Sequence, residues 1–396
     1  MYTRNFSRDD FQKFQEIIDH IYDSHQAISE AINYLGINLL KELSKEIGNV
    51  FFSPFSISSA LAMGFIGSSH ETAEEMTTVL GYEVAKVESG DVKTSFHHLF
   101  SEINKTSNLC TLNVANVVFG DCNLSVQEDF KKSLRDFFHA LFVDVDFMND
   151  SAAAVKKAND WIKTKTENKI SHLLDSLDSD TKLVILNAVY FRGFWLHAFK
   201  EKSTFLQHFY NKGLDDEPKL VEMMHLKEKF FYANDNSFKA LKLPYKGENL
   251  AMLLLLPNSR NGVDKLEQQI TTEFLRHVNE TLCETEVKVA LPKLHLEYSK
   301  SLKNALKNLG LRRAFEAGAH FDQMCDKENL YVSDVIHKAV LEVNEEGTEV
   351  AASTAVMMNK YSRTHCAEFI IDHPFVFLIY NCKNDLILFM GKVVEL

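Results

Sequence analysis

Strand-like and helix-like segments are interleaved along this chain without a regular alternation. Short apolar runs that are typical of strands occur at 112–120, 141–147, 182–193, 249–257, 284–298, 373–380 and 385–395. Segments with helical spacing lie at 126–142, 152–177, 267–279 and 299–309. A doubly wound parallel sheet would need strand and helix to alternate regularly, so this order predicts an α+β fold.

The composition is that of one large domain. Six prolines and fifteen glycines in 396 residues leave no Pro/Gly-rich linker, and the 45% hydrophobic residues, including 30 phenylalanines, are ample for one core. A net charge of −12 without a dense Lys/Arg cluster argues against a nucleic-acid partner. None of the six cysteines forms a Cys-x-x-Cys pair, so we expect free thiols and no metal site.

Residues 1–26 are predicted to form an N-terminal extension. Apolar side chains recur there at helical spacing between Asp, Glu and Lys, at Phe11, Phe14, Ile17, Ile18, Ile21 and Tyr22. This pattern predicts an amphipathic helix docked on the domain, with a partner-binding arm as the alternative, and a second helix is expected at 27–47. Neither a signal peptide nor a run of transmembrane length is recognisable, so we expect no membrane span and leave the compartment open between the cytoplasm and release by an unconventional route.

The sequence carries none of the familiar catalytic or nucleotide-binding motifs. The chain has no G-x-S-x-G, G-x-x-x-x-G-K-[ST], G-x-G-x-x-G or H-E-x-x-H sequence. The stretch "DVDFMND" (144–150) lacks the turn glycine and the terminal glutamate of an EF-hand loop, and an exposed strand face explains it better. We therefore expect no enzyme activity, no catalytic residue, no metal and no cofactor.

The segment "NEEGTEVAASTAVMMNKYSRTH" (344–365) combines features of a loop and of a strand. Every second residue is small or β-branched at Thr348, Val350, Ala352, Thr354 and Val356. Between 348 and 359 only Glu349 is charged, and there is no proline. Such a run can form a strand, whereas its two ends are typical of an exposed loop.

Four motifs, in family order, resemble those of the serpins. They are "NVFFSPFSISSALAMGFIGS" (49–68), "LVILNAVYFRGFW" (183–195), "SDVIHKAVLEVNEEGTEVAASTA" (333–355) and the closing pair "DHPFVFLIY" and "ILFMGKVV" within 372–394. The resemblance implies a serpin domain at 27–396: a metastable single domain with three β-sheets, eight to nine helices and an exposed reactive centre loop at about 345–371.

The resemblance also implies a function, that of a suicide-substrate inhibitor of serine proteases. A protease cleaves the loop, the loop inserts as a new middle strand of the main sheet, and the acylated protease is trapped covalently. The expected partner is a chymotrypsin-like or trypsin-like serine protease. Heparin is not expected to bind, because 88–102 carries no basic stripe, and we expect a monomer. A non-inhibitory binding or carrier protein on the same scaffold is the alternative.

The hinge of the loop can be carried over residue by residue. It comprises Glu345, Glu346, Gly347, Thr348, Glu349, Val350, Ala351 and Ala352. Inserted residues at alternate positions from Thr348 would face the core, where a charge would be unpaired and a proline would interrupt the ladder; neither occurs. Val350 departs from the family's usual alanine, and its bulk would slow insertion, which is the main support for the carrier alternative.

The resemblance to inhibitory serpins implies a reactive bond about fourteen residues after the hinge glycine. This spacing indicates Tyr361-Ser362, which suits a chymotrypsin-like pocket. The alternatives are Arg363-Thr364, with a loop two residues longer, and Lys360-Tyr361, with a loop one residue shorter.

Six further residues match family positions beneath and beside the main sheet. Ser53, Pro54, Ser56, Asn187 and His337 match the "shutter", whose polar contacts must re-form when the sheet opens, and Trp195 matches the "breach", where the loop first enters. Simple core packing is the alternative for all six.

Overall fold

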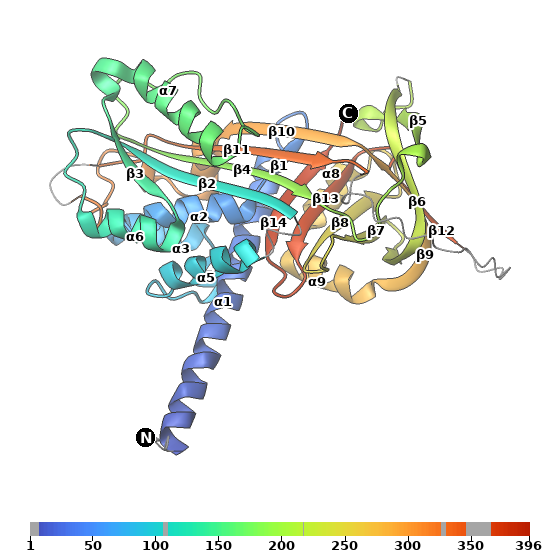
Figure 1. Cartoon of the computed structure of the whole chain (residues 1–396), viewed down its shortest axis with the longest axis horizontal. Helices are drawn as coiled ribbons and strands as arrows, with labels where there is room; N and C mark the ends of the chain where they lie inside the picture. Colours follow the sequence, from blue (N-terminus) through green and yellow to red (C-terminus); the bar gives the residue numbers. More distant parts are fainter. Residues whose placement is uncertain (1–7, 106–109, 217, 326–329, 346–365) are drawn as a thin grey trace.

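A computed structural model describes residues 8–105, 110–216, 218–325, 330–345 and 366–396 (Figure 1). Its helices are α1 (Arg8–Leu43), α2 (Pro54–Phe65), α3 (His70–Val79), α4 (Tyr82–Ala85), α5 (Val92–Lys105), α6 (Glu128–Phe138), α7 (Phe147–Lys165), α8 (Val263–Gln269), α9 (Thr272–Thr281) and α10 (Lys303–Leu309). The described residues thus form ten α-helices, against the eight to nine expected.

The strands of a five-stranded sheet run along the long axis of the molecule (Figure 1). Its order is β10 (Leu294–Ser301), β11 (Asp334–Val343), β4 (Leu183–Gly193), β2 (Cys110–Asp121) and β3 (Leu141–Val145). The two central strands, β11 and β4, run parallel to each other. Each has an antiparallel neighbour on its other side, β10 beside β11 and β2 beside β4. We call the β11–β4 pair the seam.

The remaining strands form one nine-stranded network. Its main path is β1 (Val50–Phe52), β14 (Ile387–Val393), β13 (Phe375–Asn381), β8 (Leu250–Pro257), β7 (Phe238–Pro244), β6 (Lys219–Asn234), β9 (Cys283–Pro292) and β12 (Ala367–Ile370), and β5 (Thr204–Phe209) joins β6. The three sheets expected appear as two hydrogen-bonded networks, because the long strand β6 pairs with β5, β7 and β9 and so links two groups of strands.

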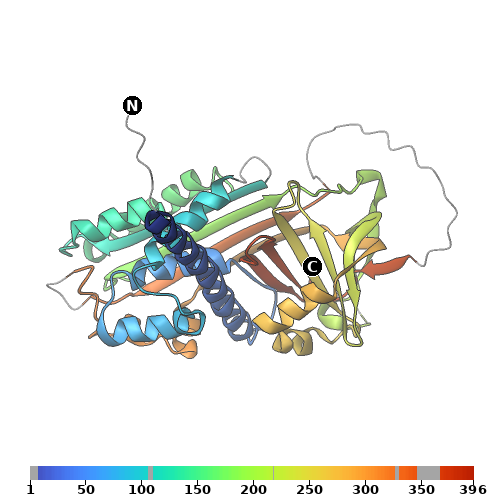
Figure 2. The ribbon, with the colours of Figure 1, turned by 90° about the horizontal axis from the view of Figure 1, so that it is seen from below.

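Helices cover both faces of the five-stranded sheet. Above it in Figure 1 lies α7, which packs with β2 and β4 in a separate apolar cluster; below lies α2, which contacts the same two strands. In Figures 1 and 2 the strands β5, β6, β9 and β12 gather at the end opposite α3 and α6. The main core joins buried side chains of α1, α2 and both sheets and is rich in phenylalanine.

The first helix, α1, is continuous over 36 residues. The break expected near residue 26 is absent because neither glycine nor proline occurs between residue 8 and Gly36. At Gly36 itself, a Cβ would lie 2.6 Å from a ring carbon of Pro54, so only glycine permits this close approach to α2. The N-terminal part of α1 projects from the body in Figure 1, which differs from the docked helix expected.

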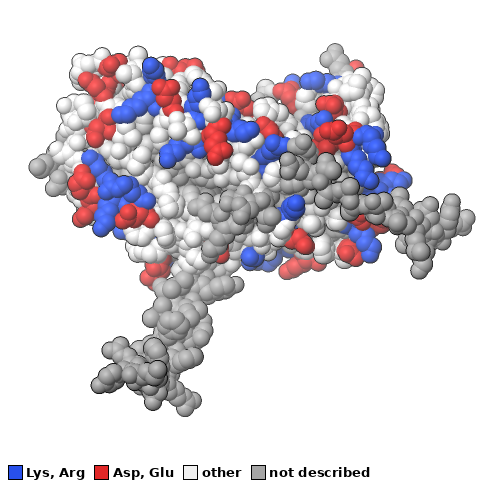
Figure 3. All heavy atoms as spheres, viewed as in Figure 1, with Lys and Arg blue, Asp and Glu red and all other residues white. Residues whose placement is uncertain are grey.

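Charges of both signs are interspersed on the face shown in Figure 3. Among the helices in the described part of the chain, none is long and apolar enough to cross a membrane. All six cysteines are free, as expected.

Candidate functional site

The seam is the place in this sheet that best accommodates an extra strand. β11 ends at Val343, after which the chain continues through Asn344 and Glu345 into 346–365. A strand that turned back from there would run antiparallel to β11. Between β11 and β4 it would have two antiparallel neighbours, whereas between β11 and β10 it would be parallel to one of them. Because parallel pairing is slightly weaker per residue, exchanging one parallel pair for two antiparallel pairs is favourable.

Two buried polar side chains face each other across the seam. His337 on β11 is in register with Asn187 on β4, and the imidazole Nδ1 contacts the Asn187 amide oxygen. The Ser53 backbone N–H donates to His337 Nε2 at 3.3 Å. Because Nε2 accepts, Nδ1 carries the proton and donates to Asn187. Burial lowers the pKa of His337 to about 3, so the ring is neutral.

The polar chain continues from β4 to α2 and β2. Asn187 Nδ2 donates to Ser56 Oγ at 2.6 Å and contacts the side-chain oxygen of Asn116 on β2. The Asn116 amide in turn donates to Ser59 Oγ at 2.9 Å. Sequence reasoning missed Asn116 and Ser59, although an asparagine inside the apolar run 112–120 is a usable signal of a buried polar contact.

Ser53 and Pro54 begin α2 beneath the seam. Ser53 is the N-cap, whose Oγ accepts from the Ser56 backbone N–H at 3.1 Å and donates to the Leu388 carbonyl at 2.5 Å. Pro54 occupies the first helical position, where its missing N–H costs nothing. The five predicted shutter residues therefore lie together, and four of them share one hydrogen-bonded network.

At the end of β4, Trp195 contacts the chain that leaves β11. Its ring stacks on Tyr245 with centroids 4.5 Å apart, and its Nε1 donates to the Asn344 carbonyl at 3.0 Å. This hydrogen bond joins the chain just beyond β11 to the chain just beyond β4.

Glu345 is the one predicted hinge residue among those described. Its buried carboxylate accepts from Thr204 Oγ1 on β5 at 2.7 Å and pairs with Lys293 Nζ at 2.9 Å. Burial alone would raise the pKa of Glu345, but the bonds from Lys293 and Thr204 outweigh it, so the pKa is lowered. Sequence reasoning missed both partners, because they are remote in the chain and carry no local signal.

The other predicted loop residues lie outside the described residues. These are the hinge positions Glu346, Gly347, Thr348, Glu349, Val350, Ala351 and Ala352 and the candidate reactive-bond residues Lys360, Tyr361, Ser362, Arg363 and Thr364. Beyond them the chain resumes in β12, which pairs in parallel with β9. Within the described ranges, no group of three His, Cys, Asp or Glu side chains is arranged to hold a metal ion.

Comparison with known proteins identifies the family. The family model "Serpin (serine protease inhibitor)" matches residues 30–396. Intracellular coagulation inhibitor 2 of Tachypleus tridentatus is 37% identical over 94% of this chain and 92% of its own length. Leukocyte elastase inhibitor of Bos taurus is 39% identical, over 93% and 99%.

A solved structure has the same fold. Uncleaved ovalbumin superposes with a TM-score of 0.86 at 27% identity, over 93% of this chain and all of that chain. The predicted α+β serpin fold is therefore confirmed, and this chain belongs to the serpin family.

Proposed function

We propose that this protein inhibits serine proteases as a suicide substrate, by loop cleavage, insertion of the cleaved loop at the seam and covalent trapping of the protease. The observation that carries the proposal is the parallel seam, which lies directly beside the end of β11 from which the loop departs. The two relatives named as inhibitors support the same class of function.

Insertion of the cleaved loop into the sheet would lower the free energy of the protein. About ten new ladder hydrogen bonds, each contributing about 1 kcal/mol net, would stabilise the cleaved form by an order of 10 kcal/mol. This is comparable with the stability of a whole domain and would make the transition one-way.

The polar network at the seam would have to open during insertion. The contact between His337 and Asn187 is a direct cross-strand pair, so a new strand between β11 and β4 must separate the two side chains. Buried polar groups left without partners are costly, so they must find new ones on the inserted strand or on α2.

Tyr361-Ser362 remains our preferred reactive bond, with a chymotrypsin-like target, and Arg363-Thr364 and Lys360-Tyr361 remain the alternatives. The bulk of Val350 supports a second candidate function, a binding or carrier protein whose loop is cut without inserting.

The proposal is tested by incubating the protein separately with chymotrypsin and with trypsin, followed by denaturing gels and intact mass spectrometry. We expect an adduct that survives denaturation and a released C-terminal peptide. The first residue of this peptide, Ser362, Thr364 or Tyr361, identifies which of the three candidate bonds was cleaved. Loop cleavage without adduct, and without a gain in thermal stability, would favour the carrier function.

A matched pair of variants separates insertion from simple cleavage. Thr348→Arg places a charge at a position that would face the core on insertion, so we expect cleavage at the wild-type rate but no adduct. Glu349→Arg places the same charge on the outward face and should still form the adduct.

A further inference from the structure

Two histidine rings stack where α1 leaves the body of the molecule. His25 on α1 and His98 on α5 lie face to face, with ring centroids 3.8 Å apart and ring planes 8° from parallel. Both residues are partly buried. In Figure 1, α5 lies beside the part of α1 that emerges from the domain, and the two helices pack together. The stack therefore joins the domain to the base of the projecting part of α1.

His25 interrupts an apolar stripe in the sequence of α1. The apolar residues of this stripe recur at spacings of three and four, at Ile18, Ile21, Ile28, Ile32 and Leu35. The same spacing includes position 25, and the three stripe residues that follow it are buried in the main core. An apolar side chain at position 25 would extend this packing at any pH, whereas an imidazole changes its charge between pH 5 and 8.

The first proton taken up by the pair has a close acidic partner, and the second adds a repulsion. His98 Nε2 lies 3.4 Å from Glu102 Oε1, so a proton on His98 forms an ion pair. A further proton on His25 would place two positive rings in stacking contact. Among the described residues, the titratable groups that act on His25 are His98 and Glu102 on α5 and Asp91 in the turn before α5. Burial and the charge of His98 lower the pKa of His25, outweighing the two carboxylates, which raise it.

The repulsion is relieved when His25 moves away from α5 into solvent. The helix beyond it is held in the core by Ile28, Ile32 and Leu35, so the movement is confined to the part of α1 before Ile28. A ring released into solvent has the ordinary pKa of about 6.5. Because the docked ring binds its proton less readily than the released ring, docking is fully favoured above about pH 6.5 and weakens as the pH falls below this value.

We propose that the His25–His98 stack is a pH-sensitive clasp, which holds the base of the projecting helix against α5 at neutral pH and releases it in acid. The clasp is independent of protease inhibition, because it involves only contacts between α1 and α5. Acid would change the direction of the N-terminal extension while the domain stays folded.

Hydrogen exchange of the full chain, followed by mass spectrometry, tests the clasp. Protection factors of the amides at 24–29, corrected for the intrinsic effect of pH on exchange, should fall severalfold in wild type between pH 7.5 and 5.5. The fall should not exceed about tenfold per pH unit, because release takes up one proton. Amides at 32–43 should keep their protection. His25→Leu completes the apolar stripe without a titrating group, so its protection at 24–29 should stay constant; equal falls in wild type and His25→Leu overturn the proposal.

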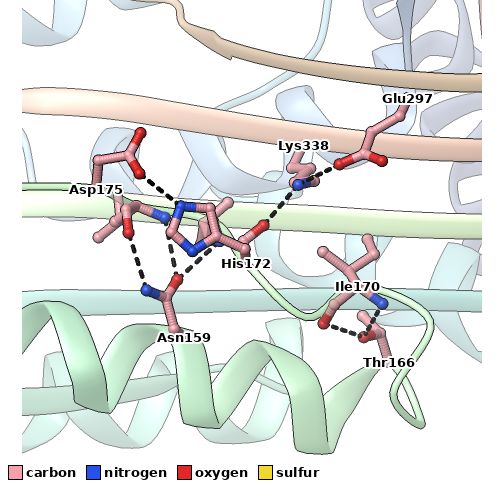
Figure 4. A network of polar contacts seen from close by, with 9 residues as sticks. Asn159, Thr166, Ile170, His172, Asp175, Glu297 and Lys338 are labelled. Carbon is pink, nitrogen blue, oxygen red and sulfur yellow. Dashed lines mark hydrogen bonds and ion pairs between the residues drawn. The ribbon is translucent and has the colours of Figure 1, made fainter.

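His172→Gln is the matched control, because this exposed histidine contacts an acidic residue instead of a second histidine. Its Nε2 lies 2.8 Å from Asp175 Oδ1, in the connection between α7 and β4 (Figure 4). The control should show the same response to pH at 24–29 as wild type.

His98→Gln distinguishes the stack from the burial of His25 alone. The His25 ring resonance in an NMR titration of the full chain, assigned by its absence from His25→Leu, should titrate closer to pH 6.5 in His98→Gln than in wild type. An unchanged titration would show that His98 does not act on His25 and would refute the clasp. Should His25→Leu not fold, His25→Gln takes its place with the same expected result, because glutamine does not titrate either.

Discussion

Acid should destabilise this protein in part through one residue, His337. In the folded protein its Nε2 accepts from the Ser53 N–H, so a second proton would place two donors against each other in a fully buried site. The folded pKa is about 3, below the value of about 6.5 expected when the chain is unfolded. Stability contributed by the neutral ring is therefore fully present above pH 6.5 and is lost as the pH falls from 6.5 towards 3.

The size of the effect follows from the width of this window. Each pH unit below 6.5 costs about 1.4 kcal/mol of unfolding free energy, so about 3 kcal/mol is lost by pH 4.5. Because the ring is completely buried, solvent screening does not reduce this value. Other histidines with lowered pKa values, such as His25 and His139, also contribute, so the change must be measured against a variant that lacks only this ring.

We would measure urea unfolding of wild type and His337→Gln between pH 7.5 and 4.5. Glutamine does not titrate, so the excess stability of wild type over the variant should shrink by about 3 kcal/mol across this range. A constant difference at all pH values would show that His337 is not neutral and buried in the folded state, and would refute the reasoning.

Three further predictions concern stability and thiol access. Glu345→Gln removes the charge paired with Lys293, and we expect the free energy of unfolding to fall by about 1 kcal/mol in urea titrations; an unchanged value would mean that the pair contributes nothing. Gly391→Ala would place a Cβ 2.7 Å from the Val50 carbonyl oxygen and should cost about 1–3 kcal/mol, whereas Gly90→Ala, with nothing within 4 Å, should be neutral. Equal thermal midpoints would contradict this. Iodoacetamide should alkylate the two exposed thiols of the native protein before the two buried ones, as peptide mapping would show; the exposed pair is Cys122 and Cys283 and the buried pair Cys110 and Cys325.

Strands whose pattern is set by burial could be predicted well from the sequence. The runs expected at 182–193 and 249–257 correspond to β4 and β8 within a residue at each end, because both strands are buried along nearly their whole length and are mostly apolar. By contrast, β5, β6 and β7 were missed. The strand β6 is half exposed and carries several charges, so no apolar run marks it.

The predicted ends of two elements were wrong because one or two polar residues decide the local backbone structure there. The strand expected at 141–147 ends at Val145, because Asp146 caps α7 by accepting from the Asn149 N–H at 2.9 Å. The helix expected at 152–177 ends at Lys165, because Glu167 and Asn168 adopt positive φ values. Both features depend on backbone angles that periodicity does not report.

The site could be predicted only where a motif carried it. The residues matched to the shutter were singled out through their motifs, and the structure brings their side chains together, but the partners of Glu345 depend on which strands become neighbours. The order of the strands brings Thr204 and Lys293 into contact with Glu345, although Thr204 and Glu345 are 141 positions apart in the sequence. No local sequence pattern predicts such a contact.

The continuous first helix has a practical consequence for handling the molecule. At a rise of about 1.5 Å per residue, the sixteen residues between 8 and 24 extend the helix by about 24 Å. This extension projects from the body at a distance from β5 and β12, the strands beside the two described ends of the loop (Figure 1). An affinity tag or surface linker joined at this end would therefore be separated from β5 and β12 by the length of the helix, and immobilisation through it should leave that end of the molecule accessible.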